Sequence, residues 1–405
     1  MVSTSKPATI ILYQIVEFTI QLLRGTILKE IFNYGLNLNS FINLNLLKLR
    51  AASLWELATP KNISYWWGLG SFLGIIMVLQ IGSGLVLAFY YVRGRIAWRS
   101  VVEITREVSS GWLIRLIHSN TASFLFIILF SHFLRGLYYS SFYIKMPWLS
   151  GWLLIVLTIA AAFLGYVLPW GQISFWGATV IINLLRILPI GNLLVIWLWG
   201  GFYVSTFTCT FFFAIHYLVP FIIIGLIGIH LLILHYRGRS SSRSRVLKIK
   251  FQELYLIKDR VNLLILWLIW LYILLSPDWS ADPVNFTVSD LTTSPLHIQP
   301  EWYFLHLYAV LRSIPNKLGG LVGFVLALVL LLSLMLITSI QRSREITLTK
   351  LIFWGFIIRN LILLWLGRQP VEFPYVFIGQ ISTNLYFILL RIWLVLDQNL
   401  NWYFY

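Results

Sequence analysis

The sequence contains one cysteine, Cys209, and few charged residues. A single cysteine excludes an internal disulfide, a zinc site built from several cysteines and a covalent haem attachment through a C-x-x-C-H motif. Charged residues make up 11% of the 405 residues, whereas a soluble domain carries about 25%. Hydrophobic residues make up 59%. We therefore expect lipid, and not water, to be the solvent of this chain.

The net charge of +16 raises the question of nucleic acid, but the placement of the basic residues argues against it. Eight basic and two acidic residues lie between Arg237 and Arg260, whereas residues 276–311 hold four acidic residues and no lysine or arginine. Both stretches lie between hydrophobic runs, as the positive-inside rule requires. The basic stretch is expected on the cytosol-like (matrix) side and the acidic stretch on the outer side.

Eight apolar runs approach the ~20 residues that cross a bilayer. They are Tyr65–Tyr91, Trp112–Tyr138, Gly151–Leu168, Phe207–His235, Leu263–Leu275 with a few polar residues before it, Leu318–Ile340, Leu351–Leu366 and Val376–Leu396. We expect an all-α membrane protein in three parts: an N-terminal extension (1–63), a four-helix bundle (64–240), and four further helices with the acidic outer loop (241–405). Within the extension, Ile10–Ile31 predicts an amphipathic helix on the membrane surface or against a partner.

Four of the seven histidines repeat one interval. His118 and His132 are 14 residues apart, and so are His216 and His230. Fourteen residues bring a helix back to nearly the same face, about 21 Å along its axis. The helix count makes both helices descend from the outer side, so His118 shares a depth with His216 and His132 with His230. Two bis-histidine haem sites fit this geometry; histidines that only satisfy polar needs of a bundle are the simpler alternative.

Glycines and arginines follow the same register. Gly70 and Gly84 are 14 residues apart, as are Gly151 and Gly165. Glycine permits the close approach of a flat macrocycle, although helix contact through small residues also explains such pairs. Arg115 and Arg135 lie one turn from His118 and His132. They can pair with haem propionates, or they can extend to the membrane interface.

Two further groups of polar residues lie near the ends of the helices, one on each side of the membrane. Glu301, in Gln299-Pro-Glu-Trp-Tyr303, either begins a helix with Pro300 in its first position or accepts a proton from a quinol hydroxyl. On the matrix side, His235, Lys258 and Asp259 are either interfacial residues or proton donors to a quinone. An electron carrier with two haems explains these features together. A histidine-lined transporter needs no matched registers, and a dihaem anchor of a dehydrogenase needs only one quinone site.

Nine motifs between Ser64 and Arg391 carry a family resemblance. They are Trp66-Trp-Gly-Leu-Gly-Ser71, Arg115-Leu-Ile-His118, Arg135-Gly-Leu-Tyr-Tyr139, Gly165-Tyr-Val-Leu-Pro-Trp-Gly-Gln172, Phe175-Trp-Gly-Ala-Thr179, His230-Leu-Leu-Ile-Leu-His235, Pro300-Glu-Trp-Tyr303, Arg312-Ser-Ile-Pro-Asn-Lys-Leu-Gly-Gly320 and Gln369-Pro-Val-Glu372. On these motifs the chain resembles cytochrome b of the mitochondrial ubiquinol–cytochrome c oxidoreductase, complex III.

The resemblance implies two non-covalent b-type haems, the outer on His118 and His216 and the matrix-side one on His132 and His230. It implies a quinol-oxidation pocket and a quinone-reduction pocket, with ubiquinol and ubiquinone as substrates of a proton-translocating Q cycle. The first pocket comprises Phe163, Tyr166, Gly177, Glu301 and Tyr303, of which Glu301 and Tyr303 are the catalytic candidates; the second comprises His235, Lys258 and Asp259.

The resemblance also implies partners and a location. They are a Rieske iron–sulfur protein, a cytochrome c1-type subunit and other complex III subunits, in a homodimeric complex of the mitochondrial inner membrane. The chain departs from the family pattern in four places. Arg239 replaces a small polar residue, Gln252-Glu-Leu254 replaces His-Pro-Tyr, Phe373 replaces a histidine, and Gly68 stands where an asparagine is common.

Overall fold

The computed structural model describes residues 58–60, 63–237, 248–336 and 347–399. The amphipathic helix expected at Ile10–Ile31 lies outside these residues, as does Arg239. The chain divides into two compact units, residues 1–62 with 243–256 and residues 63–242 with 257–405. In the first unit, strands β1 (Ala58–Pro60) and β2 (Lys248–Lys250) pair antiparallel. Every candidate site residue belongs to the second unit.

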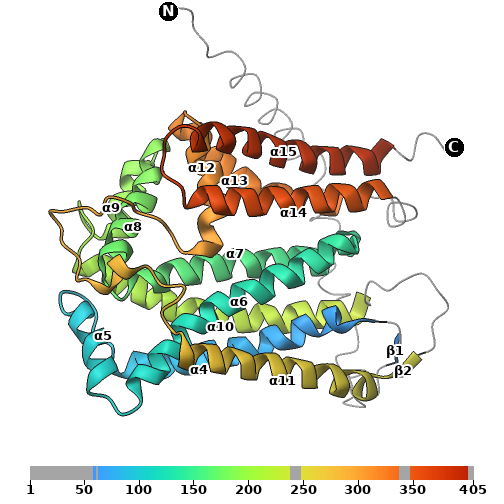
Figure 1. Cartoon of the computed structure of the whole chain (residues 1–405), viewed down its shortest axis with the longest axis horizontal. Coiled ribbons are helices and arrows are strands. Elements are labelled where there is room, and N and C mark those ends of the chain that lie inside the picture. Colours follow the sequence, from blue (N-terminus) through green and yellow to red (C-terminus); the bar gives the residue numbers. More distant parts are fainter. Residues whose placement is uncertain (1–57, 61–62, 238–247, 337–346, 400–405) are drawn as a thin grey trace, which may run out of the picture. The chain divides into compact units, whose positions relative to one another are not determined.

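Four long helices form the bundle expected from the first half of the chain. They are α4 (Leu69–Tyr90), which follows the short helix η2 (Tyr65–Gly68), then α6 (Gly111–Tyr138), α7 (Lys145–Val167) and α10 (Thr206–Arg237). Helix α4 packs along α6, and α7 packs along α10 (Figure 1). Helix α7 starts at Lys145 and not at the expected Gly151, because Pro147 in its first turn needs no N–H partner there. The bundle thus consists of two helix pairs, each with one glycine helix and one histidine helix.

The second half adds further helices. They are α11 (Phe251–Leu275), α12 (Leu305–Ser313), α13 (Lys317–Ser333) with η7 (Leu334–Leu336), α14 (Thr347–Gly367) and α15 (Tyr375–Asn399). Seven helices among the described residues are long and apolar enough to cross a membrane, which confirms the all-α membrane class. Helix α11 is not among these seven, because Lys258, Asp259 and Arg260 interrupt its apolar stretch. It is nevertheless as long as the others, and its crossing of the membrane stays a prediction.

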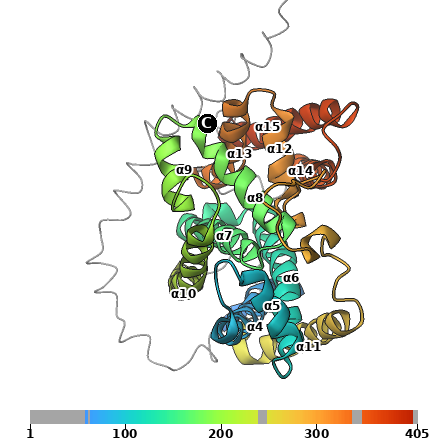
Figure 2. The same cartoon turned by 90° about the vertical axis from the view of Figure 1, so that its left-hand side faces the viewer.

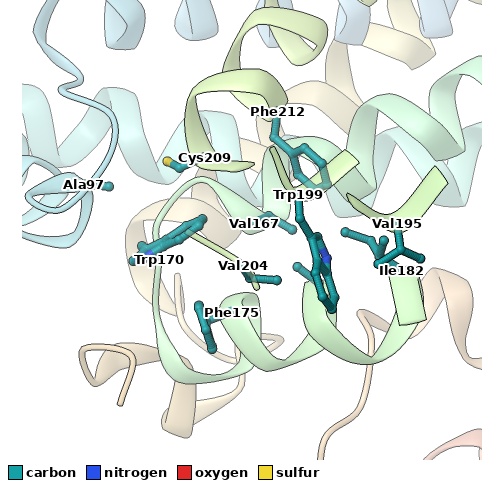
Figure 3. Close-up of a cluster of buried hydrophobic side chains, with 11 residues drawn as sticks. Ala97, Val167, Trp170, Phe175, Ile182, Val195, Trp199, Val204, Cys209 and Phe212 are labelled. Carbon is teal, nitrogen blue, oxygen red and sulfur yellow. The ribbon is translucent and has the colours of Figure 1, made fainter. Parts of the chain in front are cut away.

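Three short helices that the sequence analysis did not foresee lie at one end of the bundle. They are α5 (Ala97–Arg106), α8 (Gln172–Asn183) and α9 (Gly191–Trp199), and Figure 2 turns this end toward the viewer. We call it the outer end, after the expected topology. A buried cluster that includes Val167, Phe175, Trp199 and Cys209 joins the end of α7 to α8, α9 and the start of α10 (Figure 3). This apolar core holds the outer end of the pair formed by α7 and α10.

The acidic outer loop is attached to the start of α8 by backbone hydrogen bonds. Gln172 N donates to Thr287 O at 3.1 Å, and Ser289 N donates to Trp170 O at 3.3 Å. The loop contains the short helices η5 (Pro283–Phe286) and η6 (Trp302–Phe304). Because the loop is tied down before it reaches Glu301, that carboxyl group is presented to the bundle from a fixed segment.

Candidate functional site

The two outer histidines face each other across the bundle. The rings of His118 on α6 and His216 on α10 have centroids 6.3 Å apart and planes at 88°. An iron bound about 2 Å from one nitrogen of each imidazole would separate the ring centroids by roughly 6 Å. The distance between these side chains therefore fits one metal-centred macrocycle between them.

Each of the four glycines lies against one of the four histidines. A Cβ at Gly84 would stand 2.8 Å from His118 Cε1, and a Cβ at Gly165 would meet His216 even more closely. At the other end, a Cβ at Gly70 or Gly151 would lie 3.4 Å from Cε1 of His132 or His230, respectively. The hollow beside each glycine thus receives an imidazole ring, and the expectation that these hollows admit a macrocycle edge stays a prediction.

Hydrogen bonds orient three of the four imidazoles. His118 Nδ1 lies 3.0 Å from Ser83 Oγ, His230 Nδ1 lies 2.7 Å from Ser150 Oγ, and His216 Nδ1 lies 2.8 Å from Ala161 O. A ring held through Nδ1 leaves Nε2 for a metal, which is the usual arrangement of ligating histidines. His132 differs, because its buried Nδ1 has no hydrogen-bond partner among the described residues.

Ser83 and Ser150 were missed by the sequence analysis, although a signal was present. Ser83 immediately precedes Gly84, and Ser150 immediately precedes Gly151. In each Ser-Gly pair the glycine makes room for an imidazole of the other helix of the same pair, and the serine hydroxyl lies within hydrogen-bonding distance of Nδ1 of that imidazole. In the Ser83-Gly84 pair the imidazole belongs to His118, and in the other pair it belongs to His230.

The two arginines take different positions. The Arg115 guanidinium lies 5.8 Å from the Phe286 ring, and the Arg135 guanidinium lies 5.2 Å from the Trp67 ring. Arg115 lines the same cavity as His118, where a cation is suited to an anionic substituent of a ligand. Arg135 is close enough to His132 and His230 to interact with both electrostatically. Each histidine pair therefore has one arginine nearby, as expected from the sequence.

A cavity of about 560 Å³ joins the outer histidine pair to the outer loop. Its walls include Gly84, Arg115, His118, Gly165, His216 and Glu301. This volume falls within the range of cofactor and small-molecule sites, about 300–1,000 Å³. Paired imidazoles with free Nε2 atoms, a cation and a cavity of this size fit a haem. The cavity also reaches the carboxyl group expected to react with quinol.

Glu301 is the residue immediately before η6, and Pro300 lies outside that helix, so Pro300 does not occupy its first position. The Tyr166 hydroxyl donates a hydrogen bond to the Glu301 carboxyl group. Burial raises the pKa of Glu301 to about 7; the hydrogen bond from Tyr166 opposes this rise, and the negative charge of Asp282 adds to it. A carboxyl group with a pKa near neutrality can accept and release a proton under physiological conditions.

The other members of the expected quinol-oxidation pocket are divided. Tyr303 is buried and stacks on Phe126 with ring centroids 4.0 Å apart, and Tyr166 and Tyr303 both line the cavity with Glu301. Phe163 instead packs against Phe212, and Gly177 lies on α8 beside open space. The structure therefore brings together Tyr166, Glu301 and Tyr303, whereas Phe163 and Gly177 do not line this cavity.

The expected quinone-reduction residues lie at the opposite end of the helices. Lys258 is buried, and its Nζ donates to Ile63 O at 2.6 Å. Asp259 Oδ1 accepts a hydrogen bond from Ser71 Oγ on α4 at 3.0 Å. His235 is half-buried near the end of α10, and no hydrogen bond among the described residues joins it to Asp259. Asp259, which the sequence analysis named, thus forms a polar link between α11 and α4 through Ser71, which it did not name.

The structure describes the side-chain surroundings of some departures from the family pattern and not of others. Phe373 is exposed between α14 and α15, with 84% of its surface accessible. The side chains of residues 252–254 lie outside the part of the chain whose side chains are described. Gly68 ends η2 and faces α11.

Two family models match this chain. The model described as cytochrome b/b6/petB matches residues 54–238, and the model described as cytochrome b(C-terminal)/b6/petD matches residues 288–387. Among solved structures, the chain is similar to one titled "Hyperthermophilic respiratory Complex III". The two are 28% identical with a TM-score of 0.79, and the match covers 88% of this chain and 97% of that chain. The matches cover both the four-helix bundle and the later helices.

Proposed function

We propose that this chain, which belongs to the cytochrome b/b6 family, is the cytochrome b subunit of a quinol–cytochrome c oxidoreductase, a respiratory membrane complex. The observation that carries the proposal is the pair of outer histidines, whose rings lie 6.3 Å apart on two helices that repeat the same histidine spacing. The similarity to a respiratory Complex III supports the assembly. A histidine-lined transporter would not need these matched registers.

We assign two b-type haems to the four histidines. His118 and His216 would hold the outer haem, and His132 and His230 the inner one, all through Nε2. Arg115 and Arg135 would pair with haem propionates, and the hollows at the four glycines would keep the imidazoles in place. A bound haem supplies a reversible one-electron carrier inside the low-dielectric membrane.

At the outer end, Glu301 would act as the proton acceptor for quinol oxidation. Oxidation of a quinol to a quinone releases two electrons and two protons. The carboxylate of Glu301 would take one proton from a quinol hydroxyl, and the Tyr166 hydroxyl would hold that carboxylate in place. Tyr303, stacked on Phe126, would shape the wall of the pocket.

At the inner end, Asp259 and His235 would supply protons to a quinone, which takes up two electrons and two protons. Lys258 would secure this pocket by holding the segment at Ile63. Release of protons at one end of the bundle and uptake at the other would charge the membrane, so that electron transfer drives proton translocation.

The partners and the location are also proposals. We propose that a Rieske iron–sulfur protein takes one electron of each quinol, that a cytochrome c1-type subunit receives it, and that the complex is a homodimer. We place the complex in the mitochondrial inner membrane, on the strength of the motifs shared with the mitochondrial family. Co-purification of the chain with inner-membrane vesicles, and of the two partners with the chain, tests this assignment.

Two measurements test the function. The purified complex should show a reduced-minus-oxidised b-type spectrum with two haems per chain; absence of the spectrum would eliminate the proposal. Glu301→Gln should slow quinol oxidation at least tenfold with both haems retained, because it removes the proton acceptor. Asp290→Asn, which alters an exposed carboxylate of the same loop, is the matched control and should leave the rate unchanged.

A further inference from the structure

Helix α11 carries a buried polar side chain that has no part in the proposed electron and proton transfers. Asn262 has 6% of its surface accessible, although it lies in an apolar stretch of α11. A carboxamide buried away from water is costly unless its hydrogen-bonding atoms have partners. The contacts of Asn262 therefore indicate why an amide is placed here.

Asn262 binds the carboxylate of Asp259, one turn earlier on the same helix. Its Nδ2 lies 3.2 Å from Asp259 Oδ1, and Ser71 Oγ lies 3.0 Å from the same oxygen. The Ser71 hydroxyl also lies 2.8 Å from Gly68 O and has one hydrogen for the two acceptors, whereas the Asn262 amide has two hydrogens to donate. Among the described residues, Asp259 Oδ2 makes no hydrogen bond. The carboxylate is thus held through one of its two oxygens.

The same amide fills the space beside Gly68. Asn262 Nδ2 lies 3.3 Å from Gly68 O and 3.4 Å from Ser71 Oγ. A Cβ at Gly68 would stand 3.6 Å from Nδ2 and 3.8 Å from Oδ1 of Asn262. These are ordinary contacts, so an alanine fits at position 68, whereas a longer side chain there would enter the volume that the amide occupies.

We propose that Asn262 is a positioning residue of the quinone-reduction pocket, which orients the Asp259 carboxylate through its side-chain amide. The space between η2 and α11 holds one carboxamide, and in this chain the amide comes from α11. This inference rests on the proposed quinone-reduction site, and it adds Asn262 and the vacant position 68 to that site.

The test uses the intact complex and a short-chain ubiquinone analogue. Asn262→Ala should slow re-oxidation of the inner haem by this quinone roughly tenfold, the effect of losing one hydrogen bond to a charged group. Haem content and the rate of outer quinol oxidation should not change. The double variant Gly68→Asn with Asn262→Ala moves the amide from α11 to η2 and should restore the rate to within about threefold of the wild-type rate. Leu264→Ala, which shortens an exposed side chain of the same helix, is the matched control and should react at the wild-type rate.

The outcomes separate this inference from the proposed function. If Asp259→Asn does not slow inner-haem re-oxidation, the quinone-reduction site itself is wrong. If Asp259→Asn is slow while Asn262→Ala reacts at the wild-type rate, only the role of Asn262 is overturned. Should Asn262→Ala lose haem, the double variant decides: recovery of haem and rate supports the role of the amide, and recovery of haem without the rate refutes it.

Discussion

Alanine at Gly84 should disturb haem binding and alanine at Gly70 should not, although both residues lie on α4 and face histidines of α6. A Cβ at Gly84 would stand 2.8 Å from His118 Cε1, whereas a Cβ at Gly70 would stand 3.4 Å from His132 Cε1. Carbon atoms pack at about 3.5–4.0 Å. The His118 ring must therefore move by roughly 0.7 Å, and the His132 ring by roughly 0.1 Å.

The first displacement exceeds what a metal ligand tolerates, and the second does not. Metal–ligand distances are kept within about 0.2 Å. Overpacking of this kind costs about 1–3 kcal/mol, which weakens binding about 5- to 150-fold. Glycine-to-alanine changes inside a helix otherwise gain about 1 kcal/mol of helix propensity, and both variants gain it equally. The difference between them isolates the contact with the imidazole.

The assay is the haem stoichiometry of the purified complex, with the optical spectrum identifying which haem remains. We expect Gly84→Ala to lose much of the outer haem and to keep the inner one, and Gly70→Ala to keep both. Full retention of both haems in Gly84→Ala would refute the reasoning, as would equal losses in the two variants.

Three further predictions concern the acid, the hydrogen-bonded ligand and the iron ligand. Quinol oxidation should accelerate as pH rises through about 7, because only deprotonated Glu301 accepts a proton. Asp282→Asn removes a negative charge that raises the pKa of Glu301, so the acceleration should occur at lower pH in this variant. Rapid-mixing kinetics measure the rate, and an unchanged pH profile in the variant would contradict this. Ser150→Ala removes the partner of His230 Nδ1 and should raise the midpoint potential of the inner haem by up to about 60 mV, which is a tenfold change in a one-electron equilibrium. A redox titration in which only the potential of the outer haem shifts would count against this role of Ser150. His132→Leu should leave one haem per chain, and two haems would exclude this histidine as a ligand.

The features that the sequence predicted are those that depend on local helix geometry. The spacing of 14 residues holds for any α-helix, so the alignment of His118 with His216 followed from the helix count alone, and the structure places their rings 6.3 Å apart. The membrane class and the cytochrome b resemblance are confirmed for the same reason: long apolar runs and short motifs are properties of neighbouring residues.

The features that the sequence did not predict depend on packing between distant segments. Helix α11 begins at Phe251, which is further before Leu263 than the few polar residues that we expected, because its polar turns are stabilised by contacts of Lys258 and Asn262 with the segment before α4. No local pattern indicates that contact. The short helices α5, α8 and α9 lack the length of a membrane span, so their sequences gave no comparable signal. The separation of Phe163 from the Glu301 cavity likewise depends on how α7 meets α10.

The Gly–His pairing has a consequence for the order in which the protein is assembled. Each glycine hollow and the imidazole beside it belong to one helix pair: α4 with α6, or α7 with α10. The first pair precedes the second in the chain and carries one histidine of each ligand site, so neither site is complete until α10 is in place. A bound haem would then link the two helix pairs. A nascent chain that stops after α6 should enter the membrane and bind no haem.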